Sequence, residues 1–130
     1  MKKKEIKILL VDDEPDILEI VGYNLSNEGY QVITASNGKE GVKAAKKNNP
    51  HLIILDVMMP EMDGIEACEQ IRKLPGHEET IIAFLTARGE DYSQVAGYDA
   101  GADDYITKPI SQDALVKALN RWLIKDSSTS

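Results

Sequence analysis

The sequence of 130 residues contains one cysteine, Cys68, so it cannot form an internal disulfide. No apolar run approaches the roughly 20 residues that a membrane-spanning helix needs. The basic start, Met1 to Lys4, is not followed by the apolar core and cleavage site of a signal peptide. We therefore expect a soluble protein of a reducing compartment, the cytoplasm, without membrane contact. We expect Cys68 to be a buried thiol on a helix.

Histidine and clustered basic residues are also scarce. The two histidines, His51 and His77, lack the spacing of metal ligands, and we expect both to be plain surface residues. The net charge is −7, and we find no basic cluster after the first four residues. Because an acidic surface repels nucleic-acid phosphates, we expect no direct contact with DNA or RNA.

Short β-branched apolar runs alternate along the chain with stretches in which apolar residues recur at helical spacing. Three of the runs are apolar almost throughout, which is typical of parallel strands buried on both faces. The pattern predicts an α/β fold, a doubly wound five-stranded parallel sheet with five flanking helices, in one domain over residues 1–125. Residues 126–130 are predicted to be a tail or the start of a linker. The predicted strands are Ile6 to Val11, Gln31 to Thr34, His51 to Leu55, Ile81 to Leu85 and Asp104 to Ile106.

The predicted helices follow from apolar stripes. The stripes begin at Ile17, Val42, Ile65 and Leu115, and a weaker fourth helix is expected over Asp91 to Ala100.

Polar side chains follow the predicted strands at their carboxyl ends. Asp12 and Asp13 follow the first strand, Asp56 the third, Thr86 the fourth and Lys108 the fifth. Ligands of doubly wound folds bind at this edge of the sheet. Three carboxylates there repel one another unless a cation offsets their charge. Oxygen ligands without histidine or cysteine favour Mg²⁺, with Mn²⁺ as the second choice.

Simpler explanations exist for these residues one at a time. Asp12 and Asp13 could cap the helix that Pro15 helps to start. Lys108 alone could be a solvated surface residue. Their occurrence together with Asp56 favours a shared site.

Four segments in order carry a family resemblance that extends from Ile6 to about Leu123. They are Ile8 to Pro15 (ILLVDDEP), Leu55 to Gly64 (LDVMMPEMDG), Leu85 to Ala87 (LTA) and Gly101 to Pro109 (GADDYITKP). Through them the chain resembles the response-regulator receiver (CheY-like) family of two-component systems, and most of all the receivers of OmpR/PhoB-type winged-helix transcription regulators. The resemblance implies a flavodoxin-like fold and a phosphoacceptor that slowly hydrolyses its own acyl phosphate, not an enzyme acting on an external substrate.

The resemblance also assigns roles at the site. It implies that Asp56 is the phosphoacceptor and that Mg²⁺ is bound by Asp13 directly, by Asp12 mainly through water, by Asp56, and by the main-chain carbonyl of Met58.

The switch residues come from the same resemblance. Lys108 and Thr86 are implied to hold phosphoryl oxygens, and Thr86 and Tyr105 to form the switch, although Tyr105 could simply pack in the core. The Lys108–Pro109 peptide is implied to be cis.

Partners implied by the family are a sensor histidine kinase, which donates the phosphoryl group, and a second copy of the chain. The dimer would use the fourth helix, fifth strand and fifth helix, with Asp103, Asp104 and Lys117 as possible interface residues. Ala96 stands where related receivers carry arginine, so we expect only a weak dimer that forms on phosphorylation.

The output stays open between two alternatives. The chain is either the receiver part of a regulator whose DNA-binding domain is missing, or a stand-alone chemotaxis-type or hybrid-kinase receiver. A haloacid-dehalogenase-type phosphatase normally has a second aspartate two residues after the nucleophile, where this chain has Met58. A Rossmann module would need a glycine-rich turn at Asp12 to Pro15. A receiver that serves only as a docking adaptor is disfavoured because the expected switch residues are present.

Overall fold

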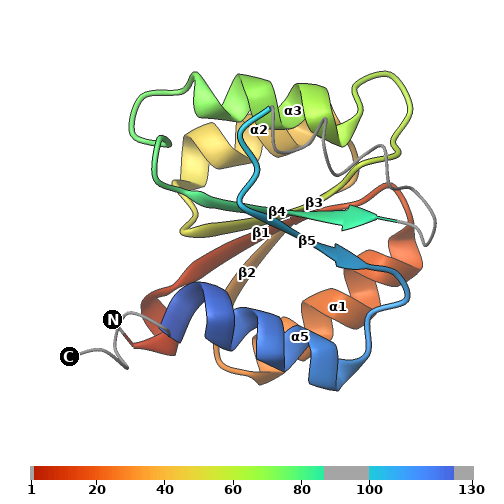
Figure 1. Cartoon of the computed structure of the whole chain (residues 1–130), viewed down its shortest axis with the longest axis vertical. Helices are drawn as coiled ribbons and strands as arrows, with labels where there is room; N and C mark the ends of the chain where they lie inside the picture. Colours follow the sequence, from red (N-terminus) through yellow and green to blue (C-terminus); the bar gives the residue numbers. More distant parts are fainter. Residues whose placement is uncertain (1, 87–99, 125–130) are drawn as a thin grey trace.

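The computed structural model describes residues 2–86 and 100–124, which form a three-layer α/β sandwich (Figure 1). Its central sheet has five parallel strands in the order β2-β1-β3-β4-β5. The strands are β1 (Lys7–Val11), β2 (Gln31–Ala35), β3 (Leu52–Asp56), β4 (Ile81–Thr86) and β5 (Asp104–Thr107). The α-helices are α1 (Pro15–Asn27), α2 (Gly38–Asn48), α3 (Gly64–Arg72) and α5 (Gln112–Leu119), with a short 3-10 helix, η1 (Lys3–Glu5), and a short π-helix, η2 (Asn120–Ile124).

The strands lie within one residue of their predicted bounds, and the predicted fold class is confirmed. The predicted helix over Asp91 to Ala100 lies outside the described residues except for Ala100, which is buried. Residues 126–130 also lie outside them. Four of the five predicted helices are found in the described residues, and the predicted fourth helix is not tested.

The three central strands of the sheet, β1, β3 and β4, bury side chains on both of their faces. In β1, Ile8 and Leu10 join one apolar cluster, while Leu9 and Val11 join the other. Figure 1 shows that α1 and α5 cover the first face and that α2 and α3 cover the second. This division explains why the central strands are apolar throughout, since no residue of β3 points to water.

Side-chain caps fix where three helices begin. Asn37, Asp63 and Ser111 each accept a hydrogen bond from the main-chain N–H three residues later, at 2.8, 2.9 and 3.1 Å. Helix α1 instead begins with Pro15 in its first turn, and its N-cap residue Glu14 makes no side-chain cap. The helices therefore start where the strand-end loops finish.

Two predictions about single residues have different outcomes. Cys68 is fully buried, as expected, and its thiol lies 3.5 Å from the Ala100 carbonyl. The histidine prediction is wrong, because His77 is only 2% exposed and its Nδ1 lies 3.1 Å from the Thr80 hydroxyl. His51 is half-buried and accepts a hydrogen bond from the Lys7 N–H at 3.0 Å. Both rings thus make hydrogen-bond contacts inside the fold, His51 with a distant strand and His77 within its own loop.

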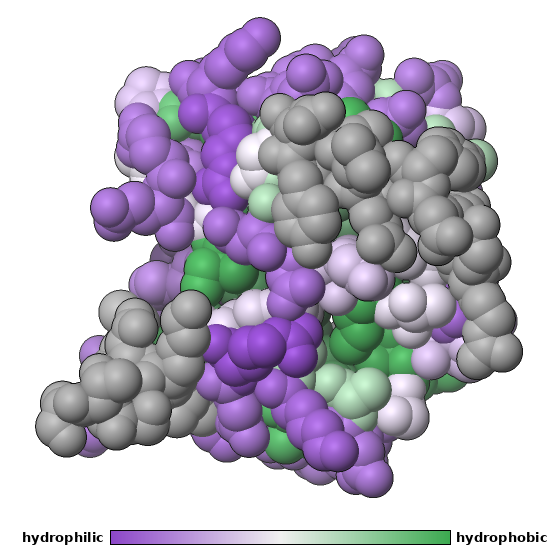
Figure 2. Space-filling view, viewed as in Figure 1, coloured by the Kyte–Doolittle hydropathy of each residue, from purple (hydrophilic) through white to green (hydrophobic). Residues whose placement is uncertain are grey.

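The surface is mainly hydrophilic on the face that Figure 2 shows, where hydrophobic residues appear only in small areas. Among the described residues, no helix is long and apolar enough to cross a membrane.

Candidate functional site

The carboxyl ends of the parallel strands bring the predicted site residues to one edge of the sheet. Val11, the residue before Asp12, is paired in register with Leu55, the residue before Asp56. Thr86 is the last residue of β4 and is paired with Thr107, the residue before Lys108. The structure thereby brings together side chains that are up to about a hundred positions apart in the sequence.

Three carboxylates converge at this edge. Ligand oxygens of Asp12, Asp13 and Asp56 all lie within 4.8 Å of one another. Asp12 is fully buried and Asp56 is 4% exposed, whereas Asp13 is exposed. An acidic cluster with two buried members has a high electrostatic cost without a cation.

Lys108 supplies the positive charge of the described site. Its Nζ lies 3.0 Å from Asp12 Oδ2, 3.2 Å from Glu14 Oε1 and 3.5 Å from Asp56 Oδ1. Its main-chain N–H donates to the Thr86 carbonyl at 2.7 Å, and the following peptide, Lys108–Pro109, is cis. Burial favours the neutral amine, but the surrounding carboxylates outweigh burial and raise the pKa of Lys108.

Asp56 is held in a state that resists ionisation. Burial, then the charge of Asp12, raise the pKa of Asp56 to about 7, and Lys108 only partly opposes them. Its Oδ1 accepts a hydrogen bond from the Met58 N–H at 3.3 Å. Gly64 packs against its main chain so closely that a Cβ there would lie 2.2 Å from the Asp56 carbonyl oxygen. The chain therefore fixes the position of this carboxylate and compensates its charge only in part.

The donor set suits a hard divalent cation. Asp12 Oδ2 is buried and accepts no hydrogen bond of good geometry among the described residues, although Lys108 Nζ lies 3.0 Å away. Asp12 Oδ1 is occupied by the Glu14 N–H at 2.9 Å. An under-coordinated buried oxygen beside two other carboxylates fits Mg²⁺, which prefers oxygen ligands and retains several waters. The capping alternative does not explain the pair, because α1 has no side-chain cap and the Glu14 N–H occupies only Oδ1 of Asp12.

The two predicted switch residues lie on neighbouring strands. Thr86 is 3% exposed and is the last residue of β4, so it lies at the same edge of the sheet as the acidic cluster. Tyr105 on β5 is half-buried, pairs in register with Phe84 and packs against the apolar cluster beneath α2 and α3. Met58, whose carbonyl was the predicted ligand, has a 56% exposed side chain.

The two predicted interface acids make contacts inside the chain. Asp103 Oδ2 accepts hydrogen bonds from Arg72 NH2 and the Ile82 N–H, both at 2.9 Å. Asp104 Oδ2 accepts hydrogen bonds from Trp122 Nε1 at 2.8 Å and Arg121 Nε at 3.0 Å.

These contacts also set the charge of Asp104. Burial raises its pKa, but the hydrogen bonds from Trp122, the Tyr105 main chain and Arg121 lower it below its ordinary value. Lys117 is exposed on α5, and Ala96 lies outside the described residues.

Sequence reasoning gave no role to Glu14, which directly follows the two aspartates at the end of the first strand and whose Oε1 lies 3.2 Å from Lys108 Nζ. It missed Arg72. Arg72 donates to the carbonyls of His77 and Thr80 in the following loop and to that of the distant Gly101, and no local pattern at the end of α3 indicates these partners.

The family model for the response regulator receiver domain matches residues 8–120. The chain belongs to this family. The receiver domain is 48% identical over 122 residues to the alkaline phosphatase synthesis transcriptional regulatory protein PhoP of Bacillus subtilis (strain 168), a match that covers 88% of this chain and 48% of PhoP. It spans about half the length of the curated relatives that it matches. The predicted family resemblance is thus confirmed.

Solved receiver domains have the same architecture. Chemotaxis protein CheY4 of Vibrio cholerae superposes with a TM-score of 0.87 at 35% identity, covering 91% of this chain and 98% of that one. The receiver domain of the sensor histidine kinase PA1611 from Pseudomonas aeruginosa PAO1 superposes with a TM-score of 0.83 at 30% identity, covering 90% of this chain and 96% of that one. That structure has a magnesium ion coordinated in its active site cleft. Receiver domains are phosphoacceptor signalling modules and not turnover enzymes on external substrates.

Proposed function

We propose that Asp56 accepts a phosphoryl group from a phosphohistidine of a sensor histidine kinase. The observation that carries this proposal is the convergence of three carboxylates and Lys108 at the carboxyl edge of the sheet, with Asp56 at its centre. The carboxylates of Asp12, Asp13 and Asp56, with the Met58 carbonyl, would hold Mg²⁺, in agreement with the magnesium ion of the PA1611 receiver. Mg²⁺ in this place supplies positive charge that favours the ionised nucleophile and neutralises phosphoryl oxygens.

The chain's own groups perform the transfer. A carboxylate oxygen of Asp56 forms a bond to phosphorus while the phosphorus–nitrogen bond of the donor breaks, and the imidazole leaves with that bond's electron pair. Lys108 Nζ, 3.5 Å from Asp56 Oδ1, is within reach of a phosphoryl oxygen and stabilises its charge. The transfer needs no general base because the nucleophile reacts as a carboxylate.

Thr86 and Tyr105 carry the signal outward from Asp56. The Thr86 hydroxyl donates to a phosphoryl oxygen, moves towards it and leaves space that the Tyr105 side chain enters. The phosphoryl group thereby shifts the population of two conformations of the surface around β5 and α5. Thr86→Ala should accept the phosphoryl group and respond to it poorly.

The proposed output is control of a DNA-binding domain in the longer protein. The chain spans about half of PhoP, which is a transcriptional regulatory protein. On phosphorylation, the surface with Asp103, Asp104 and Lys117 would form a weak two-fold dimer, which would place two DNA-binding domains on paired half-sites. The domain itself makes no nucleic-acid contact and acts in the cytoplasm.

A second candidate is a stand-alone receiver that acts by binding another protein. The match to CheY4 favours it, because this chain covers 98% of that chemotaxis protein.

Intact mass spectrometry with acetyl phosphate as the donor tests the phosphoacceptor assignment. We expect one phosphoryl group to add to the parent and to Asp16→Asn, an exposed acid of α1 that serves as the charge-matched control. Asp56→Asn should gain none, and chelation of Mg²⁺ should abolish addition to the parent. Equal addition to Asp56→Asn would disprove the assignment.

A further inference from the structure

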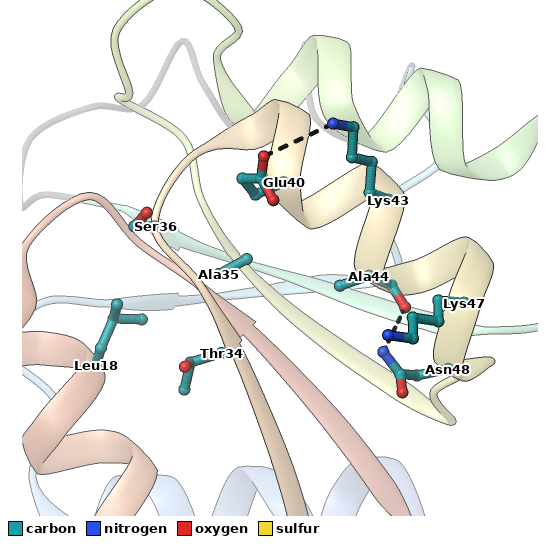
Figure 3. A pocket seen from close by; sticks show the side chains of 9 residues that line it. All are labelled: Leu18, Thr34, Ala35, Ser36, Glu40, Lys43, Ala44, Lys47 and Asn48. Atoms are coloured by element: carbon teal, nitrogen blue, oxygen red, sulfur yellow. Dashed lines mark hydrogen bonds and ion pairs between the residues drawn. The ribbon is translucent and has the colours of Figure 1, made fainter.

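A groove runs along the outer edge of the sheet, beside the edge strand β2. Its floor is Thr34 to Ser36 at the end of β2, and its volume is about 550 Å³. Leu18 of α1 forms one wall, and Lys43 and Lys47 of α2 lie on the other (Figure 3). Ligand sites in proteins commonly have volumes in this range.

The floor of the groove is the free edge of a strand. Within the described residues, β2 pairs only with β1. The Gln31 N–H donates to the Ile6 carbonyl and the Ala35 carbonyl accepts from the Asp12 N–H, so alternate residues from Gln31 to Ala35 face β1. The main-chain N–H and C=O groups of Val32 and Thr34 therefore point outward, where another extended chain could pair with them.

The helical wall of the groove is basic. Helix α2 carries four lysines against one acid, a net charge of +3 in a chain of −7. Two of these lysines, Lys43 and Lys47, line the groove together with the acid, Glu40, and Lys39 and Lys46 lie on the same helix outside the lining. The expectation that no basic cluster follows the first four residues is therefore wrong for the folded chain. All four lysines are exposed, and the one ion pair that the described structure gives them, from Lys43 to Glu40, is long at 3.9 Å. The helix dipole accounts for Lys46 and Lys47 in the last turn but not for Lys39 and Lys43.

The opposite wall is apolar. Thr34 faces α1, since its Cγ2 lies 3.9 Å from where a Cβ on Gly22 would be, and Leu18 lies beside it. A strand added to β2 would alternate its side chains between the lysines and this apolar wall. Lys43 and Lys47, one helical turn apart, are separated by about 6 Å along the axis, which matches the roughly 6.6 Å between alternate residues of a strand.

We propose that this groove binds an extended segment of a partner protein, in which acidic residues alternate with aliphatic ones, by adding it to β2 as a sixth strand. Main-chain hydrogen bonds to Val32 and Thr34 supply affinity, and the lysines select the acidic face. A second copy fits poorly, because two-fold pairing of β2 edges would bring two basic α2 helices together. Nucleic acids fit less well, because they lack the peptide N–H and C=O groups that would pair with the free edge of β2.

The groove is preformed. Helix α2 is held against β1 by Gly41, where a Cβ would lie 2.9 Å from Val11 Cγ2, and against the loop after β3 by Gly38, where a Cβ would lie 2.6 Å from the Met62 carbonyl. A fixed wall reduces the ordering cost of binding. The inference does not depend on phosphorylation of Asp56.

The probe for this site is a blocked, fluorescent peptide of alternating valine and glutamate, about eight residues long as typical strands are. We expect saturable binding by anisotropy and amide shifts in NMR spectra that centre on Val32 and Thr34. Lys43→Glu and Lys47→Glu should each weaken binding at least about fivefold, because each replaces attraction by repulsion. Lys73→Glu, which makes the same charge change at the exposed end of α3, should leave affinity within about twofold.

Two further measurements isolate the main-chain contacts. Two peptides should be compared, one N-methylated at the odd-numbered residues and one at the even-numbered residues. Only the amides that face β2 are needed, so one of these peptides should lose binding and the other should keep it. Thr34→Pro removes an outward N–H without touching the β1 ladder and should also abolish binding, with a retained NMR spectrum as evidence of folding. Binding that both methylated peptides retain, shifts that centre elsewhere, equal affinity of a valine–lysine peptide, or no binding to the parent would each overturn the proposal.

Discussion

Lys108 Nζ lies 3.0 Å from Asp12 Oδ2, an oxygen that is buried at the carboxyl edge of the sheet. The ammonium group is thus engaged by the acidic cluster before any phosphoryl group arrives. It stabilises the buried carboxylates in the unphosphorylated domain and would stabilise the phosphoryl oxygens in the phosphorylated domain.

Removing Lys108 should therefore destabilise the domain most when divalent cations are absent. We expect Lys108→Ala to lower the free energy of unfolding by about 2 kcal/mol in EDTA at pH 8, because buried carboxylates lose their counter-charge. Urea unfolding with and without Mg²⁺ measures this, and Mg²⁺ should restore most of the loss. Lys117→Ala, on the exposed face of α5, should cost less than about 0.5 kcal/mol in either buffer. Equal losses for the two variants would contradict the role of Lys108.

The raised pKa of Asp56 predicts a pH dependence of stability. Its pKa is about 7 in the folded chain, against an ordinary value of about 4 when unfolded, so the folded state binds the proton more tightly. This contribution to stability is complete below about pH 4 and is lost as the pH rises through about 7. In EDTA, the unfolding free energy of the parent should fall relative to Asp56→Asn by about 2–4 kcal/mol between pH 4 and pH 8. Parallel pH profiles for the two proteins would show that Asp56 ionises without cost.

Burial should make Cys68 inert to thiol reagents in the native state. Burial raises the pKa of its thiol to about 11, and the side chain is fully buried. Ellman's reagent at pH 8 should react with the native protein at least about a hundredfold more slowly than with the urea-unfolded chain, since access requires opening of the core. Fast labelling of the native protein would place Cys68 at the surface.

Close packing behind Asp56 makes one glycine irreplaceable. A Cβ at Gly64 would lie 2.2 Å from the Asp56 carbonyl oxygen, so Gly64→Ala must move the main chain that positions the nucleophile. We expect a loss of about 3 kcal/mol in unfolding free energy, together with slower phosphorylation.

Gly22→Ala is the matched control in α1. The Cβ there would meet only Thr34 Cγ2, at an ordinary 3.9 Å, so the change should be neutral or stabilise the domain by up to about 1 kcal/mol. A Gly64→Ala variant as stable as Gly22→Ala would disprove the packing argument.

The fold and the centre of the site could be predicted because they depend on signals that are local or topological. The apolar runs define the strands, and parallel strands bring Asp12, Asp56 and Thr86 to one edge. The roles of these residues came from the family resemblance and remain predictions. Their chemistry is untested, whereas their proximity is observed for the three aspartates and Lys108.

What could not be predicted depends on contacts between distant segments. His77 looks like an exposed loop residue in the sequence, yet the folded chain leaves it only 2% exposed. Arg72 and Asp103 form an ion pair across 31 positions. Lys43 and Lys47 of α2 line the groove beside an edge strand, and neither the net charge of −7 nor the local sequence predicts that position.

The most direct test of the central claim is chemical mapping of the phosphorylated residue. Borohydride reduces an aspartyl phosphate to homoserine, so peptide mass spectrometry after phosphorylation with Mg²⁺ and reduction identifies the acceptor. The account predicts homoserine at the position of Asp56 and aspartate at Asp12 and Asp13, with no conversion when EDTA replaces Mg²⁺. Conversion at Asp12 or Asp13, or conversion at Asp56 that is equally efficient in EDTA, would contradict it.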